Sequence, residues 1–418
     1  MLGVNLADRS GEMMKRFTPL LAVCLLVAPL CAQSRYVRTA GKHLVDPDGK
    51  KLILRGTNLG NWLVPEGYMF HFEGGPQSPR EIETLINQLV GPEEAKRFWR
   101  RYRETYITRD DIQYLKRIGF NTIRIPFHYK FFVDGKEGFA LLDRVIEWSR
   151  EAGLYVILDM HCAPAGQTGT NIDDSWGWPW LFESPEAQAR TIDVWKRIAA
   201  RYRDNTTVIG YDLLNEPIPH FPRLAIYNER LEPLYRRITA AIREVDSNHV
   251  IILGGAQWNS NFKVFGPPFD KNVMYTFHKY WTAPTQEVIQ EYVDFRDKYN
   301  VPIWMGESGE NKDEWIAQFV KTLESNEVSW TFWPYKKMDA TSSIVSFARP
   351  AHWDEIIAFA KLPQGTGDAE KLIAARPSIQ ISRMALSDLL ERIRFSNCRP
   401  NNGYIEALGM RVPPMQTR

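Results

Sequence analysis

Residues 208–217 read VIGYDLLNEP, an apolar run of strand length that ends in a polar Asn-Glu pair. The proline after the pair has no backbone N–H to donate, so it stops the strand there. Parallel barrels place their chemistry at the carboxyl ends of their strands, which makes Glu216 a candidate functional carboxylate. Residues 302–307 read PIWMGE and end in Glu307 in the same way. These two stretches predict a barrel with two glutamates at one face.

Eight strand-like apolar runs follow one another along the chain, and helical stretches separate most neighbours. They cover residues 51–56, 121–126, 154–161, 208–216, 250–254, 273–278, 302–307 and 328–333. Near-continuous apolar runs are typical of parallel strands that are buried on both faces. The alternation predicts an α/β fold, a single (β/α)₈ TIM barrel. A doubly wound open sheet is the alternative, but the sequence lacks the glycine fingerprint of that fold.

Three further segments are expected to decorate this barrel. Residues 36–54 contain Asp48-Gly49 between two strand-like runs, which predicts a hairpin that plugs the bottom of the barrel. Residues 66–107 predict a helical insertion after the first strand. The tail predicts a helix with an apolar stripe that must be buried on the barrel. The stripe consists of Leu386, Leu389, Leu390 and Ile393.

The start of the chain has the pattern of an export signal. Residues 14–16 read MKR, and residues 17–30 form a largely apolar stretch of 14 residues. Leu30-Cys31-Ala32 then ends in a small residue, so we expect a signal peptide over residues 1–32. Fourteen apolar residues are too few to span a bilayer comfortably. This pattern predicts a secreted or periplasmic protein without a membrane span, with Met1 and Met14 both open as the start.

The remaining boundaries follow from these segments. We expect a (β/α)₈ catalytic domain over residues 33–362 and a C-terminal helical extension of the same domain over residues 363–418. The sequence shows no internal repeat and no Ser/Pro-rich linker between them. We therefore expect no detachable carbohydrate-binding module, and a monomer.

Composition and cysteine usage exclude several classes of function. A net charge of +2 argues against a nucleic-acid partner, which would show a basic stripe. Without the signal, Cys162 and Cys398 are the cysteines left. Their spacing fits no disulfide framework or metal motif, so we interpret both as buried thiols, with a single bridge as the alternative. The sequence has no CxxC, HExxH or phosphate-binding glycine loop, and we expect no cofactor and no metal.

Residues 213–217, LLNEP, resemble the signature of glycoside hydrolase family 5, the large family that contains cellulases. The resemblance implies that Glu216 is the catalytic acid/base and Glu307 the nucleophile. Glycoside hydrolysis needs two such carboxyl groups, one ionised and one protonated. In a retaining enzyme they lie about 5–5.5 Å apart. A surface glutamate at each loop entrance is the alternative interpretation.

Further residues match the family at ordered strand ends. Arg124 interrupts the apolar stretch GFNTIRIP, and a buried guanidinium needs an anionic partner. The resemblance implies that this partner is Glu307, whose pKa Arg124 would keep low; an architectural ion pair is the alternative. The resemblance also implies that His161, His278 and Tyr280 hold substrate and nucleophile. It implies that Asn215 hydrogen-bonds the sugar 2-hydroxyl.

Aromatic residues supply candidates for sugar stacking. The resemblance implies that Trp333, at the end of the eighth strand, is the platform under the reacting sugar. Trp176 and Trp178 lie in the loop after the third strand, and Trp62 follows the first strand. We expect these three to be subsite residues or, equally, to pack their own loops.

The resemblance implies an enzyme, a retaining β-glycosidase that hydrolyses β-linked glucan. Residues 58–64, NLGNWLV, and 163–167, APAGQ, resemble segments of the exo-β-1,3-glucanase branch, although the second departs from it beyond Gln167. Cellulose-like β-1,4 and β-1,3 linkages are therefore both open. A mannanase or glycosylceramidase of the same family is the alternative enzyme. A non-catalytic carbohydrate-binding barrel would require the loss of one carboxylate, and both are present.

Overall fold

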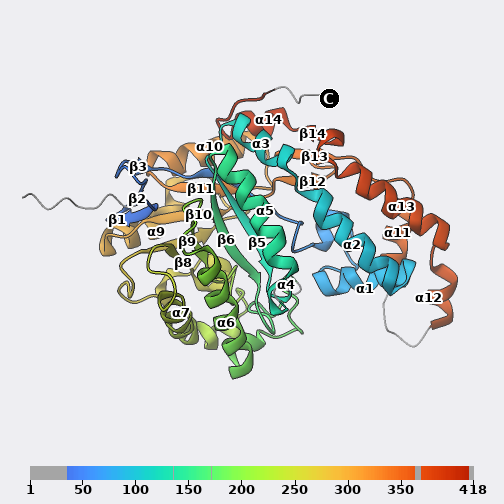
Figure 1. Cartoon of the computed structure of the whole chain (residues 1–418), viewed down its shortest axis with the longest axis horizontal. Helices are drawn as coiled ribbons and strands as arrows, with labels where there is room; N and C mark the ends of the chain where they lie inside the picture. The colour runs from blue at the N-terminus through green and yellow to red at the C-terminus, as the bar shows by residue number, and fades with distance from the viewer. Residues whose placement is uncertain (1–34, 135, 171, 363–368, 414–418) are drawn as a thin grey trace, which may run out of the picture. The chain divides into compact units, whose positions relative to one another are not determined.

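Parallel strands close into a barrel in the computed structural model, which describes residues 35–134, 136–170, 172–362 and 369–413 (Figure 1). Within these residues the barrel has eight strands in chain order, and the last pairs with the first. They are β4 (Arg55–Asn58), β5 (Thr122–His128), β6 (Tyr155–Cys162), β7 (Val208–Asp212), β8 (Val250–Gly254), β9 (Val273–His278), β10 (Ile303–Glu307) and β11 (Ser329–Phe332). The predicted TIM barrel is thus confirmed.

Helices connect successive barrel strands. They are α3 (Arg109–Ile118), α5 (Glu137–Ala152), α6 (Pro185–Tyr202), α7 (Asn228–Arg243), α9 (Gln286–Tyr299) and α10 (Asp313–Ser325), with the short α4 (Lys130–Val133) and α8 (Ala256–Asn259) in two of the loops. Short 3₁₀ turns lie at η2 (Trp180–Phe182), η3 (Pro222–Tyr227) and η4 (Phe262–Val264). Local signals set several ends: Thr108 and Asp111 form a capping box that starts α3, and Gly119 ends it with φ 115°.

Close strand pairing requires glycine at two barrel positions. A Cβ atom at Gly56 would lie 2.1 Å from the carbonyl oxygen of Thr122, and one at Gly210 would lie 2.2 Å from that of Val250. Side chains on β5 to β9 are buried on both faces almost throughout. This explains why the sequence shows continuous rather than alternating apolar runs.

The first predicted strand is wrong in its assignment. Residues 51–56 divide between two sheets: β3 (Lys51–Leu52) pairs with β2 (His43–Val45) and β1 (Arg38–Ala40), and only Arg55–Asn58 joins the barrel. The predicted hairpin is present as β2 and β3, with a turn closed by Asp46 and Lys50. Its buried Leu44 belongs to the same apolar cluster as barrel residues such as Ile157 and Trp304.

The insertion and the tail pack against each other. The insertion contains η1 (Gly67–Phe70), α1 (Pro79–Val90) and α2 (Pro92–Tyr106). The tail contains α11 (Trp353–Ala360), α12 (Ala369–Ala375), α13 (Ile379–Arg392), η5 (Phe395–Asn397) and α14 (Asn402–Ala407). Helix α13 contacts α1, α2 and α11 (Figure 1), and the predicted stripe of Leu386, Leu389, Leu390 and Ile393 is buried. A small sheet of β12 (Lys336–Met338), β13 (Val345–Phe347) and β14 (Arg399–Pro400) ties the tail to the barrel end.

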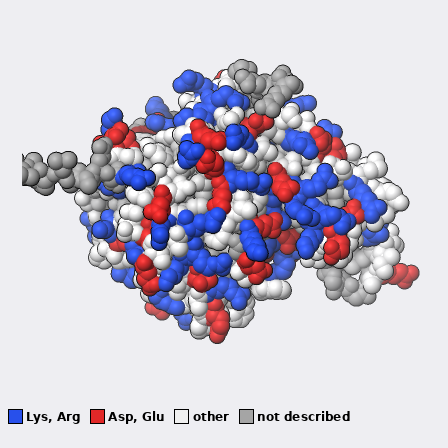
Figure 2. All heavy atoms as spheres, in the orientation of Figure 1, with Lys and Arg blue, Asp and Glu red and all other residues white. Residues whose placement is uncertain are grey.

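The cysteines, the helices and the surface charge of the described residues bear on further expectations. Cys162 and Cys398 are free and buried, so the predicted thiols are confirmed. Among the described helices, none has the length and apolarity needed to cross a membrane. The predicted signal peptide lies outside the described residues, as does the loop at 363–368. Basic and acidic side chains intermingle on the face shown in Figure 2, in keeping with the small net charge.

Candidate active site

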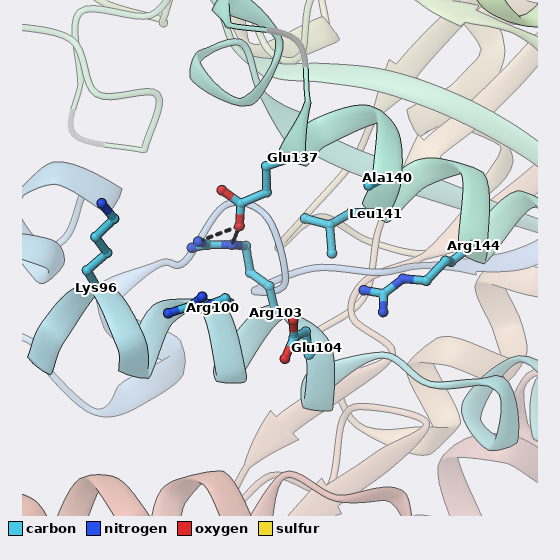
Figure 3. A pocket seen from close by; sticks show the side chains of 8 residues that line it. All are labelled: Lys96, Arg100, Arg103, Glu104, Glu137, Ala140, Leu141 and Arg144. Atoms are coloured by element: carbon cyan, nitrogen blue, oxygen red, sulfur yellow. Dashed lines mark hydrogen bonds and ion pairs between the residues drawn. The ribbon is translucent and has the colours of Figure 1, made fainter.

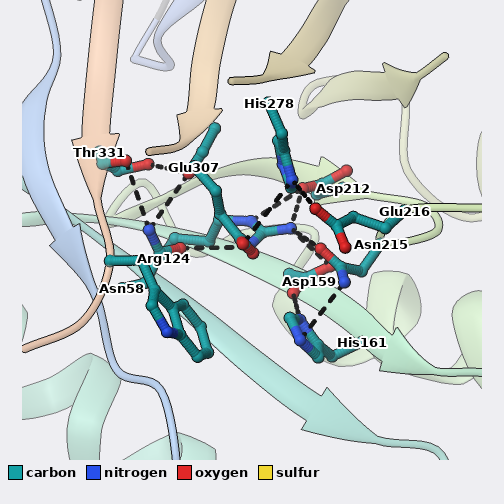
Figure 4. A network of polar contacts seen from close by, with 12 residues as sticks. Asn58, Arg124, Asp159, His161, Asp212, Asn215, Glu216, His278, Glu307 and Thr331 are labelled. Atoms are coloured by element: carbon teal, nitrogen blue, oxygen red, sulfur yellow. Dashed lines mark hydrogen bonds and ion pairs between the residues drawn. The ribbon is translucent and has the colours of Figure 1, made fainter. Parts of the chain in front are cut away.

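The guanidinium of Arg124 lies fully buried at the centre of a polar cluster inside the barrel (Figure 4). It donates to Asp212 Oδ2 at 2.9 Å through Nε and to Glu307 Oε1 through Nη1. Its Nη2 atom lies 3.1 Å from Asp159 Oδ1. Three carboxylates thus surround one cation. The predicted contact between Arg124 and Glu307 is present, but the two aspartates are additional partners that were not predicted.

Two amide side chains complete the shell around this cation. Asn58 accepts from Nη1 at 3.1 Å and Asn215 accepts from Nη2 at 2.9 Å. Burial alone would lower the pKa of Arg124, but the three carboxylates outweigh it and raise this pKa. The guanidinium therefore stays charged in the barrel interior, where an unpaired cation would be unstable.

Burial raises the pKa of Asp159 and that of Asp212 to about 7, although Arg124 opposes the shift. A carboxyl group in a low-dielectric site holds its proton more tightly, because its charged form is poorly solvated there. A neighbouring carboxylate raises the pKa of each aspartate further, since the two negative charges repel each other. Both aspartates carry the signal that singled out Arg124 in the sequence, since each is an ionisable residue within an apolar strand.

Glu307 ends β10, and its side chain is held from two sides. Oε1 accepts from Arg124, and Oε2 accepts from the hydroxyl of Tyr280 at 3.2 Å. Both contacts are made by donors, and together they fix the orientation of the carboxylate. Glu307 is 5% exposed, so it lies deep in the barrel mouth.

Glu216 lies opposite Glu307 without a cation on its carboxyl group. Its Oε1 atom is 2.8 Å from His278 Nδ1, and the side chain is 14% exposed. Burial raises the pKa of Glu216 to about 7, with His161 and Arg124 opposing. One oxygen of Glu216, one of Glu307 and one ring nitrogen of His278 lie within 4.8 Å of one another. The structure thus brings the two predicted glutamates together.

This trio has the donor types of a metal site, but its contacts favour a hydrogen-bonded cluster. His278 Nδ1 contacts Glu216, and Glu307 is already paired with the Arg124 guanidinium. A divalent cation here would lie beside that fixed positive charge, which opposes binding. The arrangement instead offers one carboxylate beside a cation and one carboxyl group beside a neutral imidazole.

The loop after β6 supports the backbone that carries Glu216. Gln167 is fully buried, and its amide donates to the carbonyls of His161 and Asn215 at 2.8 Å each. The backbone carbonyl of Gln167 accepts from Ile218 N–H at 3.1 Å. Glu216 and Ile218 have φ of 46° and 58°, a left-handed conformation that costs on the order of 1–3 kcal/mol each. These contacts hold the strained turn in place.

His161 and Trp333 stack on each other, with ring centroids 5.7 Å apart and planes 9° apart. Nδ1 of His161 lies 2.8 Å from Asp159 Oδ2, and Nε2 lies 3.3 Å from Asn215 Nδ2. Burial lowers the pKa of His161 to about 4, so the ring is neutral. The indole N–H of Trp333 donates to the Tyr68 hydroxyl at 2.7 Å. Both predicted residues therefore lie at the cluster, as do Asn215, His278 and Tyr280.

The three aromatic subsite candidates lie in different surroundings. Trp62 is 2% exposed, and its indole N–H donates to the carbonyl of Arg103 in α2 at 2.8 Å. Trp62 is therefore a core residue packed under α2, and its ring is not exposed for sugar stacking. Trp178 donates to the Tyr227 hydroxyl at 2.9 Å and is only partly exposed. Trp176 is 70% exposed, with the guanidinium of Arg80 3.6 Å from its ring centroid. Trp176 is thus the candidate with a free ring face.

Sequence reasoning missed Glu66, a third buried glutamate beside the cluster. Its Oε1 atom lies 3.8 Å from His161 Nε2 and has no hydrogen-bond partner among the described residues. Burial raises the pKa of Glu66 well above its usual range, and Glu307, Glu310 and Glu216 add to this effect. An unpaired buried carboxyl oxygen is costly unless a ligand supplies the missing partner. The sequence feature that indicates Glu66 is its position directly after Pro65, in the segment that follows the first strand.

A separate cavity of about 500 Å³ lies between α2 and α5 (Figure 3). Charged side chains dominate its lining, and Arg103 pairs with Glu137 across it at 2.7 Å. The lining residues are Lys96, Arg100, Arg103, Glu104, Glu137, Ala140, Leu141 and Arg144. None of the predicted site residues contributes to it.

Comparisons with known proteins found a matching family model and several relatives. The cellulase model of glycosyl hydrolase family 5 matches residues 85–339. A β-xylosidase of Phanerodontia chrysosporium is 30% identical over 351 residues, which is 72% of this chain and 71% of the relative. A probable glucan 1,3-beta-glucosidase A of Aspergillus fumigatus is 31% identical, over 57% of each chain. A crystal structure of an endogalactoceramidase shares the fold, with a TM-score of 0.59, 18% identity, and coverage of 89% of this chain and 84% of that one.

The raised pKa values of the aspartates predict a pH dependence of stability. Asp212 has a higher pKa folded than unfolded, so between about pH 4 and pH 7 the folded state binds more protons. The stabilisation from this group is complete at low pH, and the free energy of unfolding falls as the pH rises through this range. The fall for this one group is at most about 1.4 kcal/mol per pH unit. We expect Asp212→Asn to flatten this slope, measured by urea unfolding at several pH values.

The exposed Asp204 offers a matched control, since its side chain is 83% exposed. We expect Asp204→Asn to keep the slope of the parent enzyme. A slope that Asp212→Asn leaves unchanged would contradict the assignment of a raised pKa to this cluster.

Proposed function

Because the chain belongs to glycosyl hydrolase family 5 and is therefore a glycoside hydrolase, we propose that it is a retaining β-glycosidase that hydrolyses β-linked glucan. The observation that carries the proposal is the approach of Glu216, in the loop after β7, and Glu307, at the end of β10, which have oxygens within 4.8 Å of each other. Retaining enzymes hold their carboxyl groups about 5–5.5 Å apart, whereas inverting enzymes need about 6.5–9.5 Å. The short separation leaves no room for a water molecule between Glu307 and the anomeric carbon, so Glu307 itself attacks that carbon.

The surroundings of the two glutamates support different roles for them. Arg124 and Tyr280 both contact Glu307, which favours an ionised nucleophile that attacks the anomeric carbon. Glu216 lies beside a neutral imidazole, and burial raises its pKa to about 7. A carboxyl group with that pKa can protonate the departing oxygen and then deprotonate water near neutral pH.

Other side chains of the cluster are suited to holding the reacting sugar. Asn215 lies next to Glu216 in the chain, and we assign it to the sugar 2-hydroxyl, a contact that strengthens in the transition state. Trp333, stacked on His161, forms one wall of the mouth. We assign Glu66 to a hydroxyl on the same sugar, because a donor from the substrate would satisfy its orphaned oxygen.

The substrate class follows from the relatives and stays broad. The family model is named for cellulase and one relative for glucan 1,3-beta-glucosidase, which together support β-1,4- and β-1,3-glucan. Xylosidase and galactoceramidase activities also occur in the names of similar proteins. Parallel assays on cellulose, laminarin, mannan and aryl β-glucosides and β-xylosides decide among them. Activity on none of the β-glucosides would overturn the glucan assignment.

The first test separates the two glutamates. We expect Glu307→Gln to abolish turnover on every substrate, since no leaving group replaces the nucleophile. Glu216→Ala should abolish polysaccharide hydrolysis but still release an acidic phenol from an aryl glycoside in a burst. Added azide, which needs no general base, should speed the second step and give a β-glycosyl azide. The measurements are stopped-flow absorbance and NMR of the product.

The exposed Glu229 provides a control for these substitutions, because it lies at the start of α7 outside the cluster. We expect Glu229→Ala to keep the activity of the parent enzyme. An α-configured azide, or equal loss of all activities in both glutamate variants, would rule out the assigned roles.

Glu66 can be tested by the same assays. We expect Glu66→Ala to lower kcat/KM by roughly tenfold to a hundredfold, the loss typical of a hydrogen bond to a buried carboxyl group. Glu66→Gln keeps a neutral donor and should lose less if Glu66 is protonated in the enzyme. Unchanged kcat/KM in the alanine variant would remove Glu66 from the sugar site.

We also propose that the enzyme is exported, on the basis of the basic and then apolar stretch at residues 14–30. The mature chain should begin near Gln33 and be recovered outside the cytoplasm. N-terminal sequencing of the recovered enzyme is the measurement. A mature chain that still contains residues 1–13 would contradict the signal.

A further inference from the structure

A strained turn lies beside the loop that carries the proposed acid/base Glu216. In α8 the residues Gln257, Trp258 and Asn259 have φ of 52°, 55° and 60°. Three consecutive non-glycine residues in the left-handed region are rare, because each Cβ atom crowds the following carbonyl oxygen. Such strain persists where neighbouring contacts enforce it, and it clusters at functional sites.

Contacts from two other elements hold this turn in place. The N–H of Trp258 donates to the carbonyl of Ile218 at 3.2 Å, within the loop that carries Glu216. The amide of Gln257 exchanges two hydrogen bonds with Asn228 at the start of α7, at 2.8 and 3.3 Å. Asn261 Nδ2 donates to Gln257 Oε1 at 2.7 Å. The turn is therefore fixed relative to both the Glu216 loop and the outer helix layer.

The turn aims Asn259 at the imidazole of His278. Asn259 is fully buried, and its Nδ2 atom lies 3.1 Å from His278 Nε2. Gly254 makes room for it, because a Cβ atom there would lie 2.2 Å from Asn259 Oδ1. An amide N–H that donates to Nε2 requires this nitrogen to carry a lone pair and no proton.

The opposite nitrogen of the ring faces two carboxyl groups. His278 Nδ1 lies 2.8 Å from Glu216 Oε1 and 3.7 Å from Glu307 Oε2. Burial lowers the pKa of His278 to about 3, with Glu307 opposing and Arg124 and His161 adding to the shift. The ring is therefore neutral and has a single N–H. Two acceptors on the Nδ1 side and a donor on the Nε2 side place that proton on Nδ1.

We propose that Asn259 is a positioning residue that fixes His278 as its Nδ1–H tautomer and thereby directs the acid proton of Glu216 to Oε2. The inference rests on the proposed role of Glu216 as acid/base. Since Nδ1–H donates to Oε1, the proton of the acid form occupies Oε2. During glycosylation this proton passes from Oε2 to the glycosidic oxygen while the bond from that oxygen to the anomeric carbon breaks and Glu307 forms the new bond. In the second step water gives a proton to Glu216, and its oxygen bonds the anomeric carbon while the bond from that carbon to Glu307 breaks.

Loss of Asn259 has a specific consequence under this proposal. Without the amide donor, the ring can hold its proton on Nε2, and the lone pair of Nδ1 then faces Glu216 Oε1. That lone pair attracts the acid proton of Glu216 to Oε1, away from the oxygen that protonates the leaving group. The proton would remain in the site, but on an atom that cannot deliver it.

The direct test is the tautomer itself, measured by ¹⁵N NMR of the imidazole nitrogens in the enzyme labelled with ¹⁵N-histidine. His278→Gln identifies the His278 signals. We expect protonated Nδ1 and unprotonated Nε2 in the parent enzyme. Protonated Nε2 with unprotonated Nδ1 would overturn the proposal, and this readout needs no variant of Asn259.

The kinetic test compares leaving groups. Asn259→Ala should lower kcat/KM for an alkyl β-glucoside on the order of tenfold or more, because general acid catalysis contributes about 10²–10⁴-fold to such substrates. For a dinitrophenyl β-glucoside, whose departure needs no acid, the loss should stay within about threefold of the parent value, since the general acid contributes little there. Equal losses on both substrates would mean that Asn259 serves the fold rather than proton delivery.

Asn272 is a matched control, a buried asparagine just before β9 at the opposite end of the barrel strands. Its amide donates to the carbonyl of Asn248 at 2.8 Å and accepts from Thr39 N–H at 2.9 Å. Asn272→Ala should therefore leave the leaving-group dependence and the His278 signals unchanged. A change in either for Asn272→Ala would show that these readouts follow general loss of stability, against the proposal.

The outcomes also separate this inference from the proposed function. If Glu216→Ala gives no azide product, the acid/base assignment itself fails whatever the tautomer is. If azide rescue succeeds but His278 has its proton on Nε2, only the role of Asn259 fails.

Discussion

The guanidinium of Arg124 is the interaction on which the interior of the barrel depends. Its donors reach side chains from β4, β6, β7 and β10, namely Asn58, Asp159, Asp212 and Glu307. Removing these ions from water costs several kcal/mol per ion, so the cluster is a poor way to gain stability. It does, however, leave a planar cation with one low-energy orientation. That orientation fixes where Glu307 points and, through Asn215, where the Glu216 loop begins.

The balance of positive and negative charge in this cluster determines which of its carboxyl groups keep a proton. One guanidinium cannot neutralise three carboxylates in a low-dielectric interior. Asp159 and Asp212 relieve the excess by retaining protons to about pH 7, while Glu307 keeps two donors of its own. The two aspartates thus hold protons beside the cation, and Glu307 at the end of β10 keeps its contact with the guanidinium.

Much of this arrangement was predictable, and the errors have physical causes. Glu216, Glu307 and Arg124 were found because an ionisable residue at the end or in the middle of an apolar strand stands out locally. The boundary between β3 and β4 was missed because both belong to one continuous run, and only pairing in space separates them. For Trp62 the sequence left both a subsite and a packing position open, because its exposure depends on α2, which is far from it in sequence. Glu66 and Asn259 lie in irregular loops, where no periodicity reports which side chains point inward.

The strained backbone at the mouth links these observations. Left-handed φ values occur at Glu216, at Ile218 and through residues 257–259, all in the loops after β7 and β8. Each costs free energy that the packed barrel must offset, and each brings a side chain or carbonyl to a position that a relaxed loop would not reach. On the β10 side the pairing with β9 shifts register between Met305 and Glu307, and the Arg124 guanidinium orients the side chain of Glu307. The two glutamates are thus positioned by different means: a fixed charge holds one, and an enforced loop conformation with a neutral imidazole holds the other. A group that must stay ionised suits the first arrangement, and a group that must gain and lose a proton suits the second.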